Sequence, residues 1–132
     1  MKNESLSLRG LIRFAPSSIG ILLALLVFVA FPSSSALATQ CEPVYFDETG
    51  GTYIYVSMFT DTAGAIIFFK TSPYAFPGNP THTGSTAGPG TQVYNPMYPF
   101  VVVPWSNMYF KALAYKAGFT DSVFTEYSVR RD

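Results

Sequence analysis

The stretch at residues 108–129 reads M-Y-F-K-A-L-A-Y-K-A-G-F-T-D-S-V-F-T-E-Y-S-V, and it decides the fold class. Large and small residues alternate on both sides of residues 117–119, a pattern typical of two β-strands joined by a turn. Because side chains alternate along a strand, Lys111 should point to solvent. The inner face of the first strand should then carry Phe110, Ala112 and Ala114. We therefore expect a closing β-hairpin.

The residues before this hairpin continue the pattern of short strands and turns. Runs rich in aromatic and β-branched residues predict strands at 44–46, 52–60, 65–71 and 98–103, with a brief edge pairing at 93–94. Turn residues separate them at 47–51 and 61–64. Residues 72–92 hold four prolines and four glycines and are expected to form a long irregular loop. The whole pattern predicts an all-β, immunoglobulin/fibronectin-like two-sheet β-sandwich.

Residues 1–38 have the character of a signal-peptide helix that precedes this domain. A basic start is followed by the apolar run 19–31 and by a small-residue exit that ends at Ala38. We expect cleavage after about Ala38 and export to the cell envelope or the medium. The apolar run is shorter than the roughly 20 residues of a membrane span, so an uncleaved anchor is the less favoured alternative. The remaining domain is 39–132, with its core at 43–129.

The composition after residue 38 limits the class of partner. Five basic and seven acidic side chains remain, a net charge of five minus seven, or −2, and they form no basic patch. Nucleic acid is therefore not an expected partner. All but three of the 12 Phe, 9 Tyr and one Trp lie after residue 38, which helps so short a domain to build a core.

Cys41 is the single cysteine of the chain and cannot form an internal disulfide. Gln40 stands where a lipid-attachment motif requires a small residue, so lipidation is not favoured. The expectation is a free thiol near a frayed terminus.

Three segments together resemble a known family: residues 50–53 (G-G-T-Y), residues 64–69 (G-A-I-I-F-F) and residues 111–122 (K-A-L-A-Y-K-A-G-F-T-D-S). The chain is similar over residues 43–129 to the chitobiase/β-hexosaminidase C-terminal domain, the β-sandwich domain that accompanies family 29 glycoside hydrolases. The resemblance implies an immunoglobulin- or fibronectin-like accessory module of secreted bacterial proteins, without agreed catalytic residues. The chain departs from the family at residues 71–81, where the turn differs and the loop is longer.

No set of residues predicts an enzyme. The carboxylates are scattered, and adjacent Asp47 and Glu48 lie in an expected turn rather than across a cleft. His82, the only histidine, should be an exposed polar residue of the long loop. One histidine makes no zinc site, and Asp61 and Asp121 are expected to form turns rather than to bind calcium. We expect no cofactor and no metal, and a glycosidase fragment is the least favoured function.

Two groups of residues are candidates for binding. Exposed aromatic side chains stack on sugar rings, and five of them fall in or beside loops, although their simplest role is to cap a small core. Three residues on the outer face of the closing hairpin form a stripe that a neighbouring protein would cover. The preferred function is a secreted, non-catalytic module for protein or surface interaction, and a small carbohydrate-binding module is the alternative. The aromatic candidates are Tyr74, Phe76, Tyr94, Tyr98 and Trp105, and the interaction face is Lys111, Leu113 and Tyr115.

Overall fold

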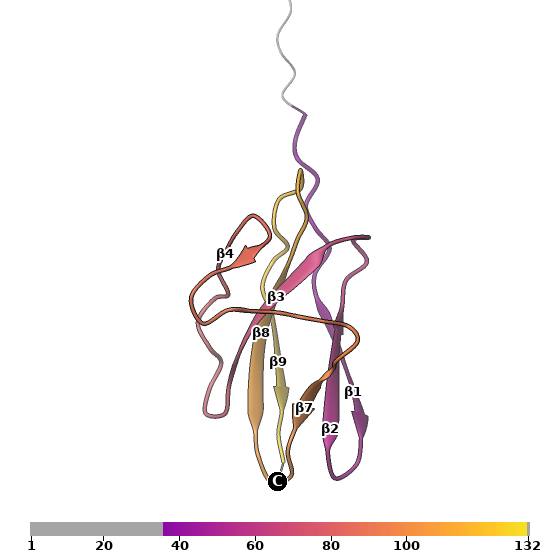
Figure 1. Ribbon diagram of the computed structural model, residues 1–132, viewed down its shortest axis with the longest axis vertical. Coiled ribbons are helices and arrows are strands. Elements are labelled where there is room, and N and C mark those ends of the chain that lie inside the picture. The colour runs from indigo at the N-terminus through magenta and orange to yellow at the C-terminus, as the bar shows by residue number, and fades with distance from the viewer. Residues whose placement is uncertain (1–35, 132) are drawn as a thin grey trace, which may run out of the picture. The chain divides into compact units, whose positions relative to one another are not determined.

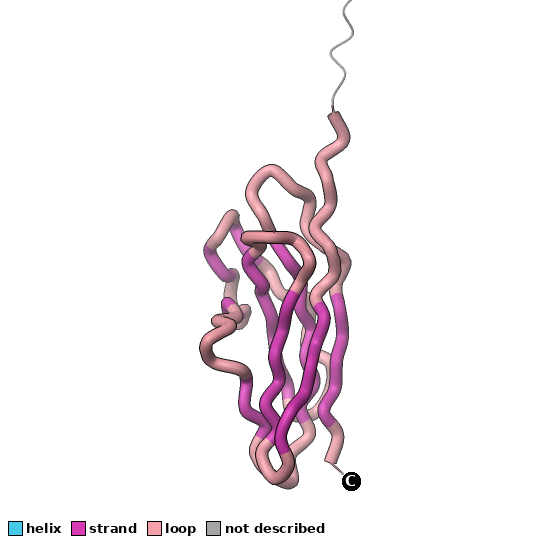
Figure 2. Tube along the Cα trace, turned by 90° about the vertical axis from the view of Figure 1, so that its right-hand side faces the viewer, coloured by secondary structure: helices cyan, strands magenta, loops and turns pink. Residues whose placement is uncertain are grey.

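The computed structural model describes residues 36–131, and this part of the chain is all-β and contains no helix (Figure 2). The predicted signal peptide lies outside the described residues except for residues 36–38, which have no regular structure. Within 36–131 there is no helix with the length and apolar character that crossing a membrane requires.

Seven strands form two antiparallel sheets, and two short strands form a third (Figure 1). The first sheet has the order β1–β2–β7, the second β6–β3–β8–β9, and β4 pairs with β5. The strands are β1 (Tyr45–Gly50), β2 (Ile54–Phe59), β3 (Ile66–Ser72), β4 (His82–Thr83), β5 (Thr86–Ala87), β6 (Gln92–Val93), β7 (Phe100–Val102), β8 (Met108–Tyr115) and β9 (Thr125–Val129).

The two larger sheets share one apolar core, which gives the domain its sandwich-like character. Val56, Met58 and Val102 enter it from the first sheet, and all three are buried. Phe100 and Phe110 meet across the sheets with ring centroids 5.2 Å apart and edge-to-face geometry, which is favourable for aromatic pairs. The second sheet contributes Ile67, Phe69, Phe110, Ala112, Ala114 and Val129.

The closing hairpin pairs as the sequence predicts, with its predicted inner face in the core. Phe110, Ala112 and Ala114 are each 0% exposed, and β8 pairs antiparallel with β9. The predicted tight turn is only part of the connection, however, because β9 begins at Thr125 and residues 116–124 intervene. Within this connection the Ser122 hydroxyl accepts a hydrogen bond from the Ala114 N–H at 2.8 Å, and the Ser122 N–H donates to the Ala114 carbonyl at 3.0 Å.

The same connection holds the start of the domain. The Thr120 N–H donates to the Thr39 carbonyl, and the Cys41 N–H donates to the Thr120 carbonyl, which forms a parallel bridge at Gln40. Cys41 is a free cysteine, as predicted, but it is 3% exposed and belongs to the core. The expectation of a frayed terminus at Cys41 is therefore wrong, because backbone pairing with residue 120 ties this segment down.

The turn between the first two strands lies later than predicted. Residues 47–50 belong to β1, and the turn is at residues 51–53. Gly50 has a φ of 113°, and a side chain there would collide with the Tyr53 carbonyl oxygen. Glycine is therefore required at the end of β1, which explains how a strand extends into an apparent turn sequence.

Tyr127 of β9 packs against β1, so the edge strands of the two larger sheets are in contact. Its ring stacks on Phe46 with centroids 4.9 Å apart and an interplanar angle of 7°. Burial, with the neighbouring Glu48 and Asp47 carboxylates adding to it, raises the pKa of Tyr127 to about 12.

The Ser122 hydroxyl should contribute measurably to stability. Ser122→Ala leaves the buried Ala114 N–H without its partner, which costs roughly 1–3 kcal/mol of unfolding free energy. Urea unfolding of residues 39–132 measures this loss. Ser57→Ala, on a half-buried strand position, is the control and should stay within about 0.5 kcal/mol of the wild type. Equal stability of both variants would contradict the role of Ser122.

Tyr127 should make the domain sensitive to alkali. The phenol loses its proton near pH 10 in the unfolded chain but near pH 12 in the folded domain, so its contribution is intact below pH 10 and is lost as the pH rises toward about 12. Stability curves measured between pH 9 and 12 should therefore fall less steeply for Tyr127→Phe than for the wild type. Tyr74→Phe, at a side chain that is 89% exposed, is the control, and identical slopes for both variants would refute the assignment.

Candidate functional site

The face that the sequence predicts for a partner protein is covered by the chain's own long loop. Figure 1 shows β4 on the side of β3 and β8 that lies away from β1, β2 and β7. Leu113 does lie on the outer face of β8, opposite Phe68 of β3, but both side chains are buried, at 2% and 0% exposed. The prediction that Leu113 offers a surface to a partner is therefore wrong, because the segment between β3 and β6 packs over this face of the sheet.

His82 fastens this loop to the sheet. Its ring lies parallel to that of Phe68, with centroids 4.7 Å apart, and also packs on Tyr115 at 4.6 Å. Its Nδ1 faces the Gly84 carbonyl oxygen and its Nε2 faces Asp121 Oδ2, both at 2.8 Å. The side chain is only 11% exposed, so the expectation of an exposed His82 is wrong. A ring enclosed by two acceptors and two aromatic rings holds the loop in place.

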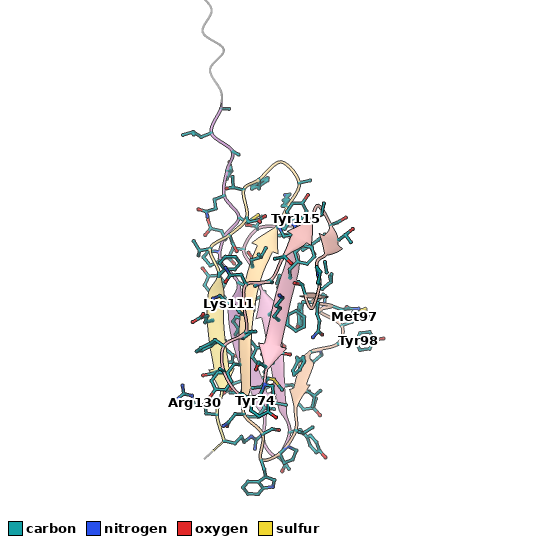
Figure 3. All side chains as sticks on the ribbon, turned by 90° about the vertical axis from the view of Figure 1, so that its left-hand side faces the viewer. Tyr74, Met97, Tyr98, Lys111, Tyr115 and Arg130 are labelled. Atoms are coloured by element: carbon teal, nitrogen blue, oxygen red, sulfur yellow. The ribbon has the colours of Figure 1, made fainter. Side chains whose placement is uncertain are left out.

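The other two residues of the predicted interaction face are partly covered as well (Figure 3). Lys111 Nζ pairs with Glu126 Oε1 at 2.9 Å and lies 5.7 Å from the Phe124 ring centroid. Tyr115 packs on His82, and its hydroxyl lies beside Gly84. Both side chains are engaged within the domain.

The five loop aromatics do not gather into one site. Phe76 packs edge-to-face on Tyr109, with centroids 5.2 Å apart, and Tyr94 packs on Phe69 at 6.4 Å. The remaining three project into solvent at separate places in the chain, and Figure 3 shows Tyr74 and Tyr98 well apart. They are Tyr74, Tyr98 and Trp105, at 89%, 73% and 89% exposed.

A different aromatic surface lies on the outer face of the β1–β2–β7 sheet, the side that Figure 2 turns toward the viewer. Tyr45 and Phe59 are cross-strand partners whose rings stack 5.5 Å apart. Tyr55 is the next aromatic residue along this face of β2, and Val101 of β7 is its partner. We call these four side chains, Tyr45, Tyr55, Phe59 and Val101, the aromatic face; each is between 42% and 49% exposed.

The alternating sequence of residues 52–60 already indicates that this face of β2 carries aromatic side chains. Tyr53, Tyr55 and Phe59 alternate with Ile54, Val56 and Met58, and both sets are apolar. Such a strand is either covered on both sides or exposes aromatic rings on one side. Nothing in the local sequence distinguishes the two cases, since they differ only in whether another segment covers the face.

The electrostatics of the aromatic face are simple. Asp47 of β1 and its partner Ser57 of β2 share the face, between the Tyr45–Phe59 pair and Tyr55. No lysine or arginine belongs to the three described strands of this sheet. Asp47 is therefore the one charged side chain on this largely apolar face.

Two hollows offer alternatives for a small ligand. One, of about 370 Å³, opens between the sheets beside the β2–β3 turn, and its lining includes Met58, Ala65, Ile67 and Tyr94. Another, of about 380 Å³, is lined by Gly51, Thr52, Pro104, Trp105 and Arg131. Among residues 36–131, no three His, Cys, Asp or Glu side chains come together as a metal site.

The comparisons leave the resemblance to the chitobiase C-terminal domain as a prediction. No protein-family model matches the chain, and no curated protein or solved structure matches it. The block at 111–122 that carries the resemblance forms most of β8 and the connection that contains Ser122.

Loss of His82 should loosen the loop. His82→Ala removes two polar contacts and the stack on Phe68, so hydrogen exchange at residues 82–87 should accelerate roughly tenfold or more, as loss of about 1.4 kcal/mol or more implies. Thr83→Ala, an adjacent exposed position, is the control. Exchange mass spectrometry that finds unchanged protection in His82→Ala would show that the loop is held by other contacts.

Proposed function

We propose that this chain is an exported, non-catalytic module that binds a partner protein through the aromatic face. In this proposal the domain is of the immunoglobulin/fibronectin-like type, comparable with the accessory domains that the sequence resembles. The observation that carries it is a set of four exposed apolar side chains, Tyr45, Tyr55, Phe59 and Val101, on one face of three neighbouring strands, where Asp47 and Ser57 separate the Tyr45–Phe59 pair from Tyr55. Exposed apolar side chains that gather on one face and are accompanied by polar residues mark sites of protein interaction.

The other candidate surfaces of the domain are less suited to binding a protein. The other sheet is already covered on its outer side by the loop that His82 holds. Of the exposed loop aromatics, Tyr74 and Tyr98 lie apart in Figure 3, and Trp105 lines a different hollow from Tyr98. The aromatic face is thus the surface where several exposed rings lie on a rigid support, and rigid aromatic anchors contribute most to protein interfaces.

The charge on the aromatic face indicates the kind of partner. Asp47 is the acidic side chain within it, and the strands that form the face carry no basic side chain. A second copy of the chain would bring another carboxylate and no cation, which disfavours self-pairing. We therefore expect a different protein with an apolar surface and a lysine or arginine that meets Asp47.

A photo-crosslinking amino acid at position 55 tests the proposal in the native organism. We expect one discrete crosslinked partner from Tyr55, and loss of that product when Phe59→Lys is added, because a charge in the centre of an apolar interface costs about 2 kcal/mol or more. The same probe at Val123, which is 56% exposed away from the aromatic face, is the matched control.

Two results would contradict the proposal. Identical products from positions 55 and 123 would mean that the face has no selectivity. A product that is a dimer of this chain would replace the hetero-partner with self-association.

A further inference from the structure

Trp105 differs from the other exposed aromatic side chains in its backbone conformation. It is the only tryptophan of the chain and is 89% exposed. Its φ is 63°, the left-handed region that residues other than glycine seldom adopt, and it is the one such residue in 36–131. The β7–β8 loop therefore holds a large apolar ring in water in an unfavourable backbone conformation, which is a feature typical of functional positions.

Arg131 and Trp105 line the same hollow, and hydrogen bonds hold the guanidinium group of Arg131 in place. Nη2 donates to the Gly51 and Thr52 carbonyl oxygens, both at 2.9 Å, and the Arg131 N–H donates to Asn107 Oδ1 at 2.9 Å. Nε is buried without a hydrogen-bond partner. Within the described residues, no carboxylate lies within salt-bridge distance of this cation. Its charge is thus held in place by neutral carbonyl groups.

Both side chains line the hollow of about 380 Å³ that Gly51, Thr52 and Pro104 complete. This volume is at the lower end of the range of roughly 300–1,000 Å³ found for small-ligand sites. A ligand that fits must combine a flat apolar face for the indole with an anionic group that accepts from Nη1, the amino group of the guanidinium that the carbonyl groups leave free. A sugar ring that carries an acidic group has both properties.

We propose that Trp105 and Arg131 form a binding site for an acidic sugar residue, a site separate from the aromatic face. The pyranose ring stacks its C–H face on the indole, and its acidic group pairs with Nη1 of Arg131, since Gly51 and Thr52 take both Nη2 hydrogens.

Fluorescence of the single tryptophan reports directly on this site. Titration of residues 39–132 with a galacturonate hexamer should give a saturable change in Trp105 emission. The methyl-esterified hexamer, which has the same rings without the charge, should give at least tenfold weaker binding. A sulfated galactan hexamer distinguishes sulfate from carboxylate as the acidic group, and stronger binding of either acidic form supports the proposal.

Substitutions in and beside the hollow test whether binding depends on Trp105 and Arg131 themselves. Arg131→Gln should weaken binding of the galacturonate hexamer roughly tenfold or more. Arg130→Gln is the matched control, because Arg130 lies over the Tyr109 ring, 5.9 Å from its centroid, and not in the hollow. Trp105→Ala, measured by calorimetry, should abolish binding, and its exposed position leaves folding intact.

Several outcomes would overturn the inference. These are no response to either acidic hexamer, an equal response to the charged and esterified forms, wild-type affinity in Trp105→Ala, or a response only to vesicles of anionic lipid. None of them bears on the crosslinking at Tyr55, so the two proposals fail separately.

Discussion

Strand β8 is covered on both faces, fully at Leu113 and partly at Lys111 and Tyr115 on the outer one, and much of the described structure follows from that constraint. Its inner face carries Phe110, Ala112 and Ala114 into the core between the sheets, and its outer face carries the buried Leu113. A central strand with two apolar faces needs a cover on each side, since exposed apolar area costs about 25 cal/mol per Å². The β1–β2–β7 sheet covers one face, and the loop between β3 and β6 covers the other.

The second cover is the less usual one. A loop rich in proline and glycine has few backbone hydrogen bonds of its own with which to hold its position. In this domain the β4–β5 pair and the His82 ring supply the attachment, through Phe68, Tyr115 and Asp121. The long loop at residues 72–92 thus covers Leu113 on the outer face of β8.

Covering one sheet leaves the other as the free surface. The aromatic face and the Trp105–Arg131 hollow are both outside the area that the loop covers, and they differ in chemistry. The first is broad, apolar and supported by strand pairing. The second is small, contains a cation, and is formed by two turns and the end of the chain. The two proposals together therefore assign two unlike partners to two separate surfaces of the domain.

Much of the architecture follows from local sequence. Alternation identified β8 and its inner face, and the aromatic and β-branched runs with the proline- and glycine-rich loop indicated that residues 36–131 contain no helix. Alternation is informative because strand geometry imposes a two-residue period that the core reinforces. The short β4–β5 pair escaped prediction because two-residue strands carry no period, and the start of β9 was misplaced because the Ser122 side chain replaces part of the backbone pairing.

The candidate sites depended on tertiary structure. Sequence alone determined that the chain has apolar side chains on the outer faces of β2 and β8, and that aromatic rings occupy loops. Only the fold decided that Leu113 is covered while Tyr55 and Phe59 are exposed, and that Arg131 lies with Trp105 although 26 positions separate their numbers. The physical reason is that exposure depends on which distant segment packs over a face, and no local period encodes that choice.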